Sequence, residues 1–232
     1  MLLVENINKN YKKKKCLQGV NLTLKDGEVK ALIGVNGSGK STLVDIICGV
    51  KRSDLGNIFI NGLNARDSKL KNKIKKIIGY MPQSFSLFSD LTVKENVEYV
   101  ASLYGVDDKR IEEVIDFCNL KPYINTLSAN LSGGYKQLLS MASAIIHKPS
   151  ILILDEPSSA MDPVFRNEFW QMIKKINKKG TSILLITHYI EELLECDTFS
   201  CLSDGVIKYD GQVEDFKEKG FINITEILDK FK

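Results

Sequence analysis

Cysteine pairs, histidines and long apolar runs are scarce in this chain, and each scarcity excludes a class of protein. Five cysteines and two histidines are scattered through 232 residues, with no CxxC pair. That distribution offers no zinc-ligand spacing, and unpaired cysteines are typical of a reducing cytosol. The longest aliphatic runs, such as residues 151–154, are far shorter than the ~20 apolar residues of a membrane-spanning helix. Glu5 also interrupts the apolar start, so we expect a soluble chain without a secretory leader.

A large excess of one charge is also missing. The chain has 32 basic and 29 acidic residues, a formal net charge of +3, and this near-balance favours no nucleic-acid partner. Lysines gather at residues 12–15 and 69–76. Each cluster fits a solvated turn or helix face, or an attraction to anionic lipid or to a nucleotide. The composition, 44% hydrophobic and 26% charged, is that of an ordinary globular protein.

Hydrophobic patterning predicts an α/β core that is interrupted by helices. An apolar strand at residues 29–33 leads through a glycine-rich loop into a helix at 41–50, the opening of a doubly wound α/β domain. Two later runs without alternation, 151–154 and 183–187, are typical of buried parallel strands. In between, apolar residues recur at helical intervals over three segments, 93–103, 111–119 and 135–146.

These patterns divide one domain into segments. We expect residues 1–82 and 147–216 to form the core and residues 83–146 to form a helical insertion. Residues 217–232 would be a short appendage with an amphipathic helix. No internal repeat and no low-complexity linker separates these segments.

Residues 34–41, GVNGSGKS, fit the phosphate-binding pattern GxxxxGK[ST] and lie between a predicted strand and helix. The glycines let backbone N–H groups turn toward phosphates, and the helix N-terminus adds partial positive charge. Lys40 can reach the β- and γ-phosphates, and the Ser41 hydroxyl can ligate Mg²⁺. The segment predicts binding of a nucleoside triphosphate, with contacts from Gly34, Asn36, Gly37, Ser38, Gly39, Lys40, Ser41 and Thr42.

Two carboxylates, Asp155 and Glu156, follow the apolar run at 151–154. Parallel strands present ligands at their carboxyl ends, so Asp155 would face the phosphates and hold Mg²⁺. Glu156 would polarise the attacking water as a general base. Alone, such a pair is often only a helix cap, but beside a phosphate-binding loop it is a candidate catalytic pair.

Residues 131–137, LSGGYKQ, place Ser132, Gly133 and Gly134 at the start of another predicted helix. This start is a second anion-receptive helix N-terminus in the same chain. The bare tetrapeptide LSGG could simply cap a helix. A single nucleotide can use both helix starts only if it is pinned between two surfaces.

The three motifs follow one another along the chain as 34–41, 131–137 and 155–156, and in that order they resemble those of the ATP-binding cassette (ABC) family, over about residues 2–211. The resemblance implies an α/β P-loop NTPase core with an N-terminal antiparallel β subdomain and an inserted all-α subdomain. It also implies that Ser132, Gly133 and Gly134 contact the γ-phosphate of ATP held by the opposite subunit. The chain would then work as a homodimer, or as a heterodimer with a second ABC ATPase.

The same resemblance gives roles to isolated residues. Tyr11 lies where the family stacks an aromatic ring on adenine, and Gln83 resembles the glutamine that senses Mg²⁺ and the attacking water. His188 resembles the switch histidine that contacts the γ-phosphate, and Asp162 resembles an aspartate that crosses the dimer interface. His147 has no such counterpart and is interpreted as structural. The implied catalytic set is Glu156, His188 and Gln83, and the implied Mg²⁺ set is Ser41, Gln83 and Asp155.

Below the family level, the chain resembles a branch whose ATPases serve exporters of drugs, polysaccharides and lipids, at residues 78–88, 91–93, 103–105 and 187–192. The implied partner is a transmembrane permease on a separate chain, which would hold the ATPase at the cytoplasmic face of the cell membrane. Phe85, Leu87 and Phe88 are candidates for the docking groove of that permease, or simply local core. A soluble ABC ATPase without a transport role, such as an iron–sulfur-assembly ATPase, is the alternative function.

Overall fold

A six-stranded sheet forms the centre of the protein. The computed structural model describes residues 1–12, 14–84, 86–217 and 224–230. The sheet has the order β10-β9-β3-β8-β7-β6, and its five strands from β9 to β6 are parallel. Only β10 runs antiparallel to its neighbour. The strands are β3 (Val29–Ile33), β6 (Ile78–Met81), β7 (Ile151–Asp155), β8 (Ser182–Ile186), β9 (Thr198–Ser203) and β10 (Val206–Gln212).

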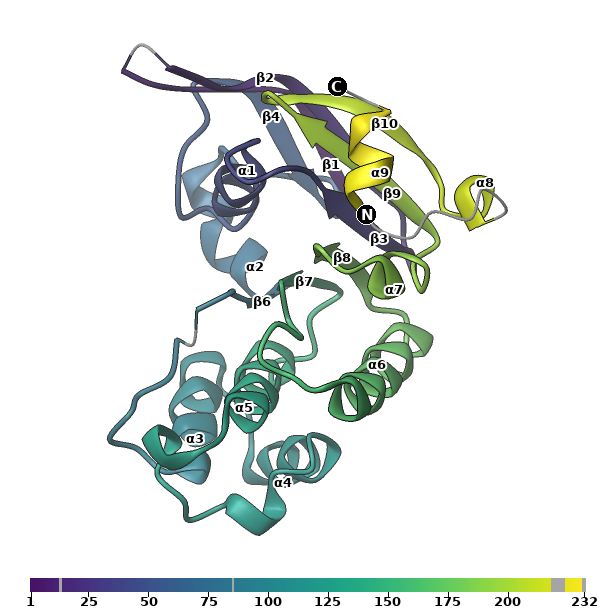
Figure 1. The fold of residues 1–232 in the computed structure, drawn as a ribbon. Coiled ribbons are helices and arrows are strands. Elements are labelled where there is room, and N and C mark those ends of the chain that lie inside the picture. The colour runs from purple at the N-terminus through teal and green to yellow at the C-terminus, as the bar shows by residue number, and fades with distance from the viewer. Residues whose placement is uncertain (13, 85, 218–223, 231–232) are drawn as a thin grey trace.

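A second sheet of four antiparallel strands lies beside the first, as Figure 1 shows. Its order is β2-β1-β4-β5, and its strands are β1 (Leu2–Tyr11), β2 (Lys14–Leu24), β4 (Leu55–Ile60) and β5 (Leu63–Asn64). Helix α1 (Lys40–Ile47) packs its apolar side into the hydrophobic core that this sheet shares with the central strands. The α/β core with an antiparallel β subdomain, which the resemblance implied, is therefore confirmed.

Helices gather at the opposite end of the molecule from the antiparallel sheet (Figure 1). They are α3 (Val93–Tyr104), α4 (Asp108–Phe117) and α5 (Gly133–Ile145), with the short turns η2 (Lys121–Tyr123) and η3 (Ser128–Asn130) between the last two. Local capping explains one start, because the Glu95 carboxylate accepts from Thr92 N at 2.8 Å while Thr92 Oγ1 accepts from Glu95 N at 3.2 Å. The three predicted helices are confirmed, with bounds that differ by up to three residues.

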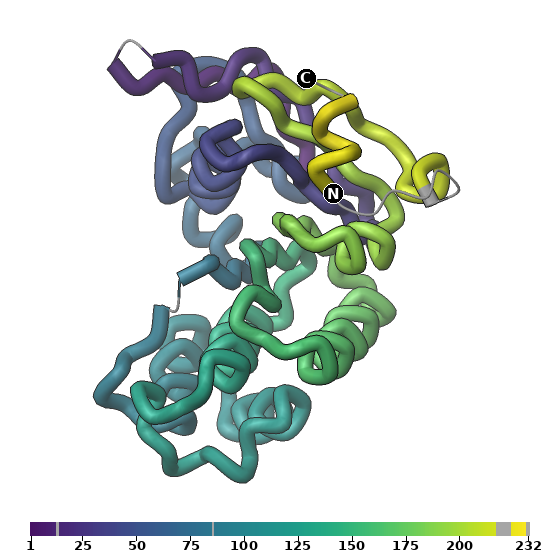
Figure 2. Tube along the Cα trace, viewed as in Figure 1, coloured from purple at the N-terminus to yellow at the C-terminus, as the bar shows by residue number. Residues whose placement is uncertain are grey.

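The remaining helices complete the layers around the central sheet. They are η1 (Ser68–Leu70) with α2 (Lys71–Lys75), α6 (Pro163–Lys178), α7 (Ile190–Leu193), α8 (Glu214–Lys217) and α9 (Ile224–Asp229). In Figure 2 the purple start and the yellow end of the described chain lie in the same half of the molecule, and the teal middle lies in the other. No helix among the described residues is both long enough and apolar enough to cross a membrane.

The central strands are buried on both faces, which explains why their sequences do not alternate. In β7, Leu152 and Leu154 face the core built with the helical end, while Ile151 and Ile153 face the core shared with α1. A buried strand of this kind holds its carboxyl end rigidly. The residues that follow it are therefore placed by the whole sheet rather than by a flexible loop.

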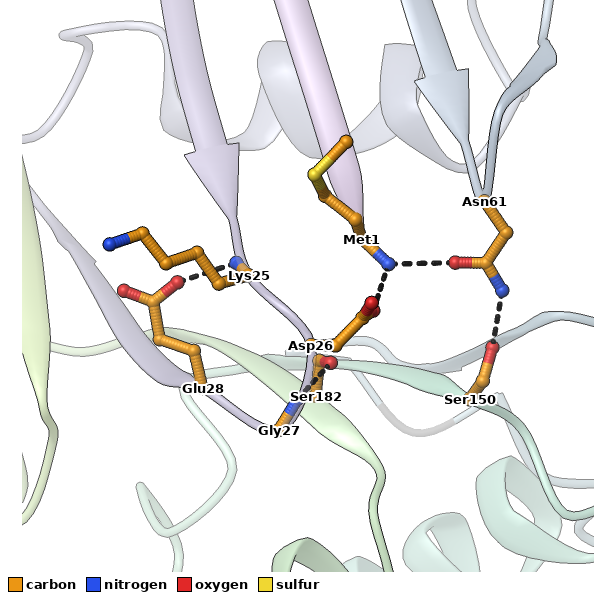
Figure 3. Close-up of polar contacts among 8 residues, drawn as sticks. All are labelled: Met1, Lys25, Asp26, Gly27, Glu28, Asn61, Ser150 and Ser182. Atoms are coloured by element: carbon orange, nitrogen blue, oxygen red, sulfur yellow. Dashed lines mark hydrogen bonds and ion pairs between the residues drawn. The ribbon is translucent and has the colours of Figure 1, made fainter.

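Polar contacts tie the two sheets together at the end opposite the phosphate-binding loop (Figure 3). Asn61, after β4, accepts from Met1 N at 2.7 Å and donates its Nδ2 to Ser150 Oγ at 3.0 Å. In the same region Gly27 N donates to Ser182 Oγ at 2.9 Å. These bonds join the antiparallel sheet to the starts of β7 and β8, so the two sheets meet in a fixed relation.

Candidate functional site

The glycine-rich loop joins β3 to α1, as the motif predicts. Gly37 and Gly39 have φ values of 81° and 111°, a left-handed region that side chains disfavour. A Cβ at Gly34 would lie 2.3 Å from the carbonyl oxygen of Leu202, so this position has no room for a side chain. Helix α1 begins at Lys40 with no acidic residue in its first turn, which leaves its N-terminal positive charge uncompensated.

Lys40 lies folded back over this loop. Its Nζ donates to the carbonyl oxygens of Gly34 at 2.7 Å and Val35 at 3.2 Å, and the residue is buried. Burial lowers the pKa of Lys40, and the nearby carboxylates of Glu156 and Asp155 partly oppose that shift. The ammonium group of Lys40 therefore lies in a partly desolvated position, near the carboxylates of Glu156 and Asp155, at the phosphate-binding loop.

Asp155 ends β7 and is only 6% exposed. Burial, followed by repulsion from Glu156, raises its pKa to about 6, and the charge of Lys40 only partly opposes this. The Tyr80 hydroxyl is also a hydrogen-bond partner of Asp155, and burial raises the pKa of that phenol. A carboxylate that is costly to ionise in isolation is a strong site for a cation.

Glu156 occupies a strained backbone position with φ of 49°, in the left-handed region. Its N–H donates to Ile186 O at 2.9 Å, which fixes the turn against the end of β8. Its carboxylate then meets two side chains from other loops. Gln83 Nε2 donates to Oε2 at 2.7 Å, and His188 Nε2 lies 2.9 Å from Oε1. The ends of β6, β7 and β8 therefore converge on one carboxylate.

These residues line one cleft of about 530 Å³ at the carboxyl ends of the parallel strands. Most of the sequence-predicted site residues share it. They are Tyr11, Asn36, Gly37, Gly39, Lys40, Ser41, Thr42, Gln83, Asp155, Glu156 and His188. Gly34 and Ser38 belong to the same loop but do not line the cleft, and the buried Ser38 Oγ has no hydrogen-bond partner among the described residues. A larger cavity, of about 850 Å³, lies between α4 and the ends of α5 and α6 and contains none of these residues.

Two cleft residues were not identified from the sequence as contacts. Lys14 and Cys16 enter the cleft from β2, and Cys16 Sγ lies 3.4 Å from Thr42 Oγ1. Lys14 belongs to the first lysine cluster, so the charge pattern gave a partial signal for it. Nothing in the sequence indicates Cys16, because only the antiparallel sheet brings β2 beside the phosphate-binding loop.

Ser132, Gly133 and Gly134 do not line this cleft. Ser132 occupies the N-cap position of α5 but its exposed side chain caps no backbone N–H. The two glycines allow close packing, because a Cβ on Gly133 would lie 2.9 Å from Ala160 Cβ and one on Gly134 would lie 2.7 Å from a ring carbon of Phe165. The start of α5 is thus a helix N-terminus that lies apart from the cleft in the same chain.

Asp162 and His147, which the sequence analysis also singled out, each make contacts within this chain. Asp162 caps α6 by accepting from Val164 N at 3.0 Å and Phe165 N at 2.9 Å. His147 has a structural setting, because its Nε2 lies 3.0 Å from Ile78 O and its ring stacks on Tyr104 with centroids 4.0 Å apart.

The candidate docking residues differ in how far they are buried. Leu87 packs against the core, which agrees with the local-core interpretation. Phe88 is 43% exposed and meets Tyr99 edge-on with ring centroids 4.6 Å apart. Phe85 lies outside the described residues.

The residues present fit a magnesium ion. Ser41 and Gln83 offer oxygen atoms in the cleft that Asp155 enters, and the raised pKa of Asp155 reflects a charge that a cation would stabilise. Within the described ranges, no three His, Cys, Asp or Glu side chains form a metal cluster of their own. Mg²⁺ sites of this sparse kind are completed by substrate phosphates.

Comparison with known proteins agrees with this geometry. Residues 17–159 match the family described as ABC transporter. The linearmycin resistance ATP-binding protein LnrL of Bacillus subtilis is 36% identical over 88% of this chain and 67% of its own length. The probable multidrug ABC transporter ATP-binding protein YbhF of Escherichia coli is 34% identical over 85% of this chain, which spans only 35% of that protein. A methionine import ATP-binding protein of Oceanobacillus iheyensis is 34% identical over 93% of this chain and 67% of its own length.

Solved structures extend the likeness to the whole fold. The ATP-binding subunit of an ABC transporter superposes with a TM-score of 0.89 at 28% identity, covering 100% of this chain and 99% of that one. A dimeric ATP-binding cassette in a post-hydrolysis state with bound ADP and Pi superposes with a TM-score of 0.85 at 29% identity, covering 92% of this chain and 99% of that one. The chain therefore belongs to the ABC transporter family and is one of its ATP-binding ATPase cassettes.

Proposed function

We propose that this chain hydrolyses ATP as one half of a cassette dimer and powers an exporter whose permease is a separate chain. The observation that carries the proposal is the carboxylate of Glu156, held between Gln83 and His188 at the edge of the cleft that the phosphate-binding loop closes. A carboxylate fixed by two neighbours beside a phosphate site is arranged to orient and deprotonate water.

The positions of the side chains support the following steps. The adenine of ATP stacks on Tyr11, and the N–H groups of the loop together with Lys40 hold the β- and γ-phosphates. Glu156 accepts a proton from a water that attacks the γ-phosphorus, the bond from that phosphorus to the bridging oxygen breaks, and ADP takes the leaving electrons. His188 holds the Glu156 carboxylate and reaches the γ-phosphate. A bound Mg²⁺, held by Ser41 and Asp155, would offset negative charge on the phosphates.

A dimer is proposed because one chain separates its two phosphate-binding features. The start of α5 at Ser132–Gly134 lies outside the cleft, so it serves a nucleotide only when a second chain presents its own phosphate-binding loop. The solved relative with bound ADP and Pi is described as dimeric, which supports this arrangement. ATP then acts as a ligand that favours the closed dimer, and hydrolysis reopens it.

Export is supported by the names of two relatives, one a drug-resistance protein and one a probable multidrug transporter subunit. The methionine import relative is about as similar, so direction needs a direct experiment. Purification of the tagged chain from its own cells tests the partner. Recovery of a polytopic membrane protein that extrudes solute from ATP-loaded vesicles is expected. Recovery of soluble partners alone would contradict a transport role and favour the iron–sulfur-assembly alternative.

Hydrolysis is tested with two substitutions and a matched control. Glu156→Gln should bind ATP, dimerise and lose roughly a hundredfold or more in turnover, because a general base contributes about that much. Lys40→Ala should lose nucleotide binding. Glu98→Gln makes the same chemical change at a partly exposed α3 position paired with Lys94, and it should hydrolyse ATP normally. Wild-type turnover in Glu156→Gln would refute the assignment of the base.

A further inference from the structure

Glu192, on α7, is a buried carboxylate that the steps above do not use. It is 1% exposed. One of its oxygens, Oε1, accepts a hydrogen bond from Ser158 Oγ, and the other, Oε2, accepts one from Thr187 Oγ1. Ser158 and Thr187 are both fully buried. A single side chain therefore joins two loops that are far apart in the sequence.

Each of these hydroxyls belongs to a residue that is one or two positions away in the sequence from a residue of the cleft. Thr187 immediately precedes His188, and its Oγ1 also accepts from Tyr189 N at 3.0 Å. Ser158 lies two residues after Glu156, in a turn where Ser159 N donates to Glu156 O at 3.3 Å. Glu192 thus holds the loop that carries the histidine and the loop that carries the general base in one fixed relation.

A buried carboxylate at position 192 costs the folded protein free energy, so stability alone does not explain why a glutamate occupies it. Burial raises the pKa of Glu192, and the hydrogen bonds from Ser158 and Thr187 and then the charge of Arg166 only partly oppose that shift. An apolar side chain of similar volume would fill this site without the desolvation cost of a buried acid. The two oxygens provide what an apolar residue cannot, which is a simultaneous bond to both loops.

The connection continues into the helical end of the molecule. Gln137, in the first turns of α5, donates its Nε2 to Ser159 Oγ at 3.2 Å. A series of hydrogen-bonded residues therefore runs from α5, through the turn after Glu156, to the Glu192 carboxylate and on to Thr187. Among the described residues, none of these three hydrogen bonds involves residues 34–41.

We propose that Glu192 is a positioning residue that sets the distance between His188 and Glu156 by tying Thr187 to Ser158. The inference rests on the proposed hydrolytic role of that pair. When either bond to Glu192 is lost, the two loops stay joined where Glu156 N donates to Ile186 O, but the residues beyond that bond lose their second tie. The 2.9 Å contact between His188 Nε2 and Glu156 Oε1 is then no longer held. Turnover then falls while ATP binding, which depends on residues 34–42, is kept.

The test deletes the two hydrogen bonds to the Glu192 carboxylate one at a time. Ser158→Ala deletes the bond to Oε1. Thr187→Val deletes the bond to Oε2, together with the one from Tyr189 N, at nearly the same side-chain volume. Each is expected to lower kcat roughly ten- to hundredfold, the cost of small misplacements at a reacting centre, with KM for ATP within about twofold of wild type. The double variant should be no slower than the slower single variant, because either change alone breaks the tie.

Conservative and matched variants separate positioning from general loss of structure. Thr187→Ser restores the hydroxyl and should recover most of the turnover. Ser128→Ala and Thr181→Val delete hydroxyls that donate to the carbonyl oxygens of Phe88 and Pro149, outside the network, and should leave kcat unchanged. Glu192→Gln keeps the shape of the side chain, but its single amide oxygen can accept a hydrogen bond from only one of the two hydroxyls unless the other hydroxyl reorients to accept from the amide nitrogen. This variant should therefore resemble Ser158→Ala or Thr187→Val.

A second measurement does not depend on hydrolysis. In Ser158→Ala, amide hydrogen exchange should speed up around Tyr189, although the substitution lies in the other loop. Unchanged kcat in both single variants, multiplicative losses in the double variant, or unchanged exchange at Tyr189 would overturn the proposal. Absence of ATP hydrolysis by the wild-type protein would instead refute the proposed function, and the exchange result would still decide whether Glu192 couples the loops.

Discussion

Replacement of Asp155 by asparagine should stabilise the nucleotide-free protein while it removes the carboxylate of the proposed magnesium site. Asp155 is 6% exposed, and burial with repulsion from Glu156 raises its pKa from 3.8 to about 6. At neutral pH the ionised carboxylate is therefore less favourable in the folded protein than in the unfolded chain, and it lowers the free energy of unfolding. Asparagine has nearly the same shape, and its amide oxygen can still accept a hydrogen bond from the Tyr80 hydroxyl.

The sign and size of the effect follow from proton linkage. Because the folded pKa lies above the unfolded value, the folded state holds the proton more tightly, and the free energy of unfolding falls as the pH rises from about 4 through 6. About two pKa units correspond to ~3 kcal/mol, and partial solvent screening reduces this to about 1–2 kcal/mol. Asp155→Asn should gain that amount at pH 8, and the gain should shrink toward zero as the pH approaches 4.

Urea unfolding at pH 8 and at pH 4.5, without nucleotide or Mg²⁺, measures the difference. Asp54→Asn is a control of opposite sign, because hydrogen bonds from Lys9 and from Asn10 N lower the pKa of Asp54. Its stabilising contribution is present above the unfolded pKa and is lost as the pH falls, so that variant should be less stable at pH 8. If Asp155→Asn were no more stable than wild type at pH 8, or gained equally at both pH values, the electrostatic reasoning would be refuted.

The local chemistry of the site could be predicted from the sequence because it depends on short motifs. The loop at residues 34–41 and the acidic end of β7 are each set by a few neighbouring residues and by an apolar strand. Helix bounds were predictable to within three residues, since periodicity marks the middle of a helix better than its ends. Helix α4, for example, begins at Asp108, earlier than the predicted 111, because Asp107 caps it by accepting from Arg110 N at 2.9 Å.

The contacts across the site could not be predicted from local patterns, because they depend on the register of the parallel sheet. Gln83 and Glu156 are 73 residues apart in the chain, and their side chains meet because β6 and β7 are paired as neighbours in the parallel sheet. The left-handed backbone at Glu156 has no sequence signal either, as glutamate is not a residue that favours it. The resemblance supplied Gln83 and His188, and the fold supplies the reason that both reach one carboxylate.

Two further predictions concern the mouth of the cleft. Tyr11→Ala should weaken ATP binding roughly tenfold and Tyr11→Phe should change it little, because stacking on adenine needs the ring and not the hydroxyl; a fluorescent-nucleotide titration measures this, and equal affinities for alanine and tyrosine would contradict the stacking role. Cys16 should be the first thiol that N-ethylmaleimide modifies, since it lines the cleft while burial raises the pKa of Cys48 to about 12 and that of Cys201 to about 11. A thiol with a pKa that high has almost no reactive thiolate at neutral pH. Bound ATP should slow the labelling of Cys16, because its Sγ lies 3.4 Å from Thr42 Oγ1 at the start of α1, and peptide mass spectrometry would locate the label. Cys16→Ser should resist inactivation by the reagent. Inactivation that persists in this variant would show that another thiol is responsible, and labelling of Cys16 that ATP does not slow would show that the nucleotide does not cover β2.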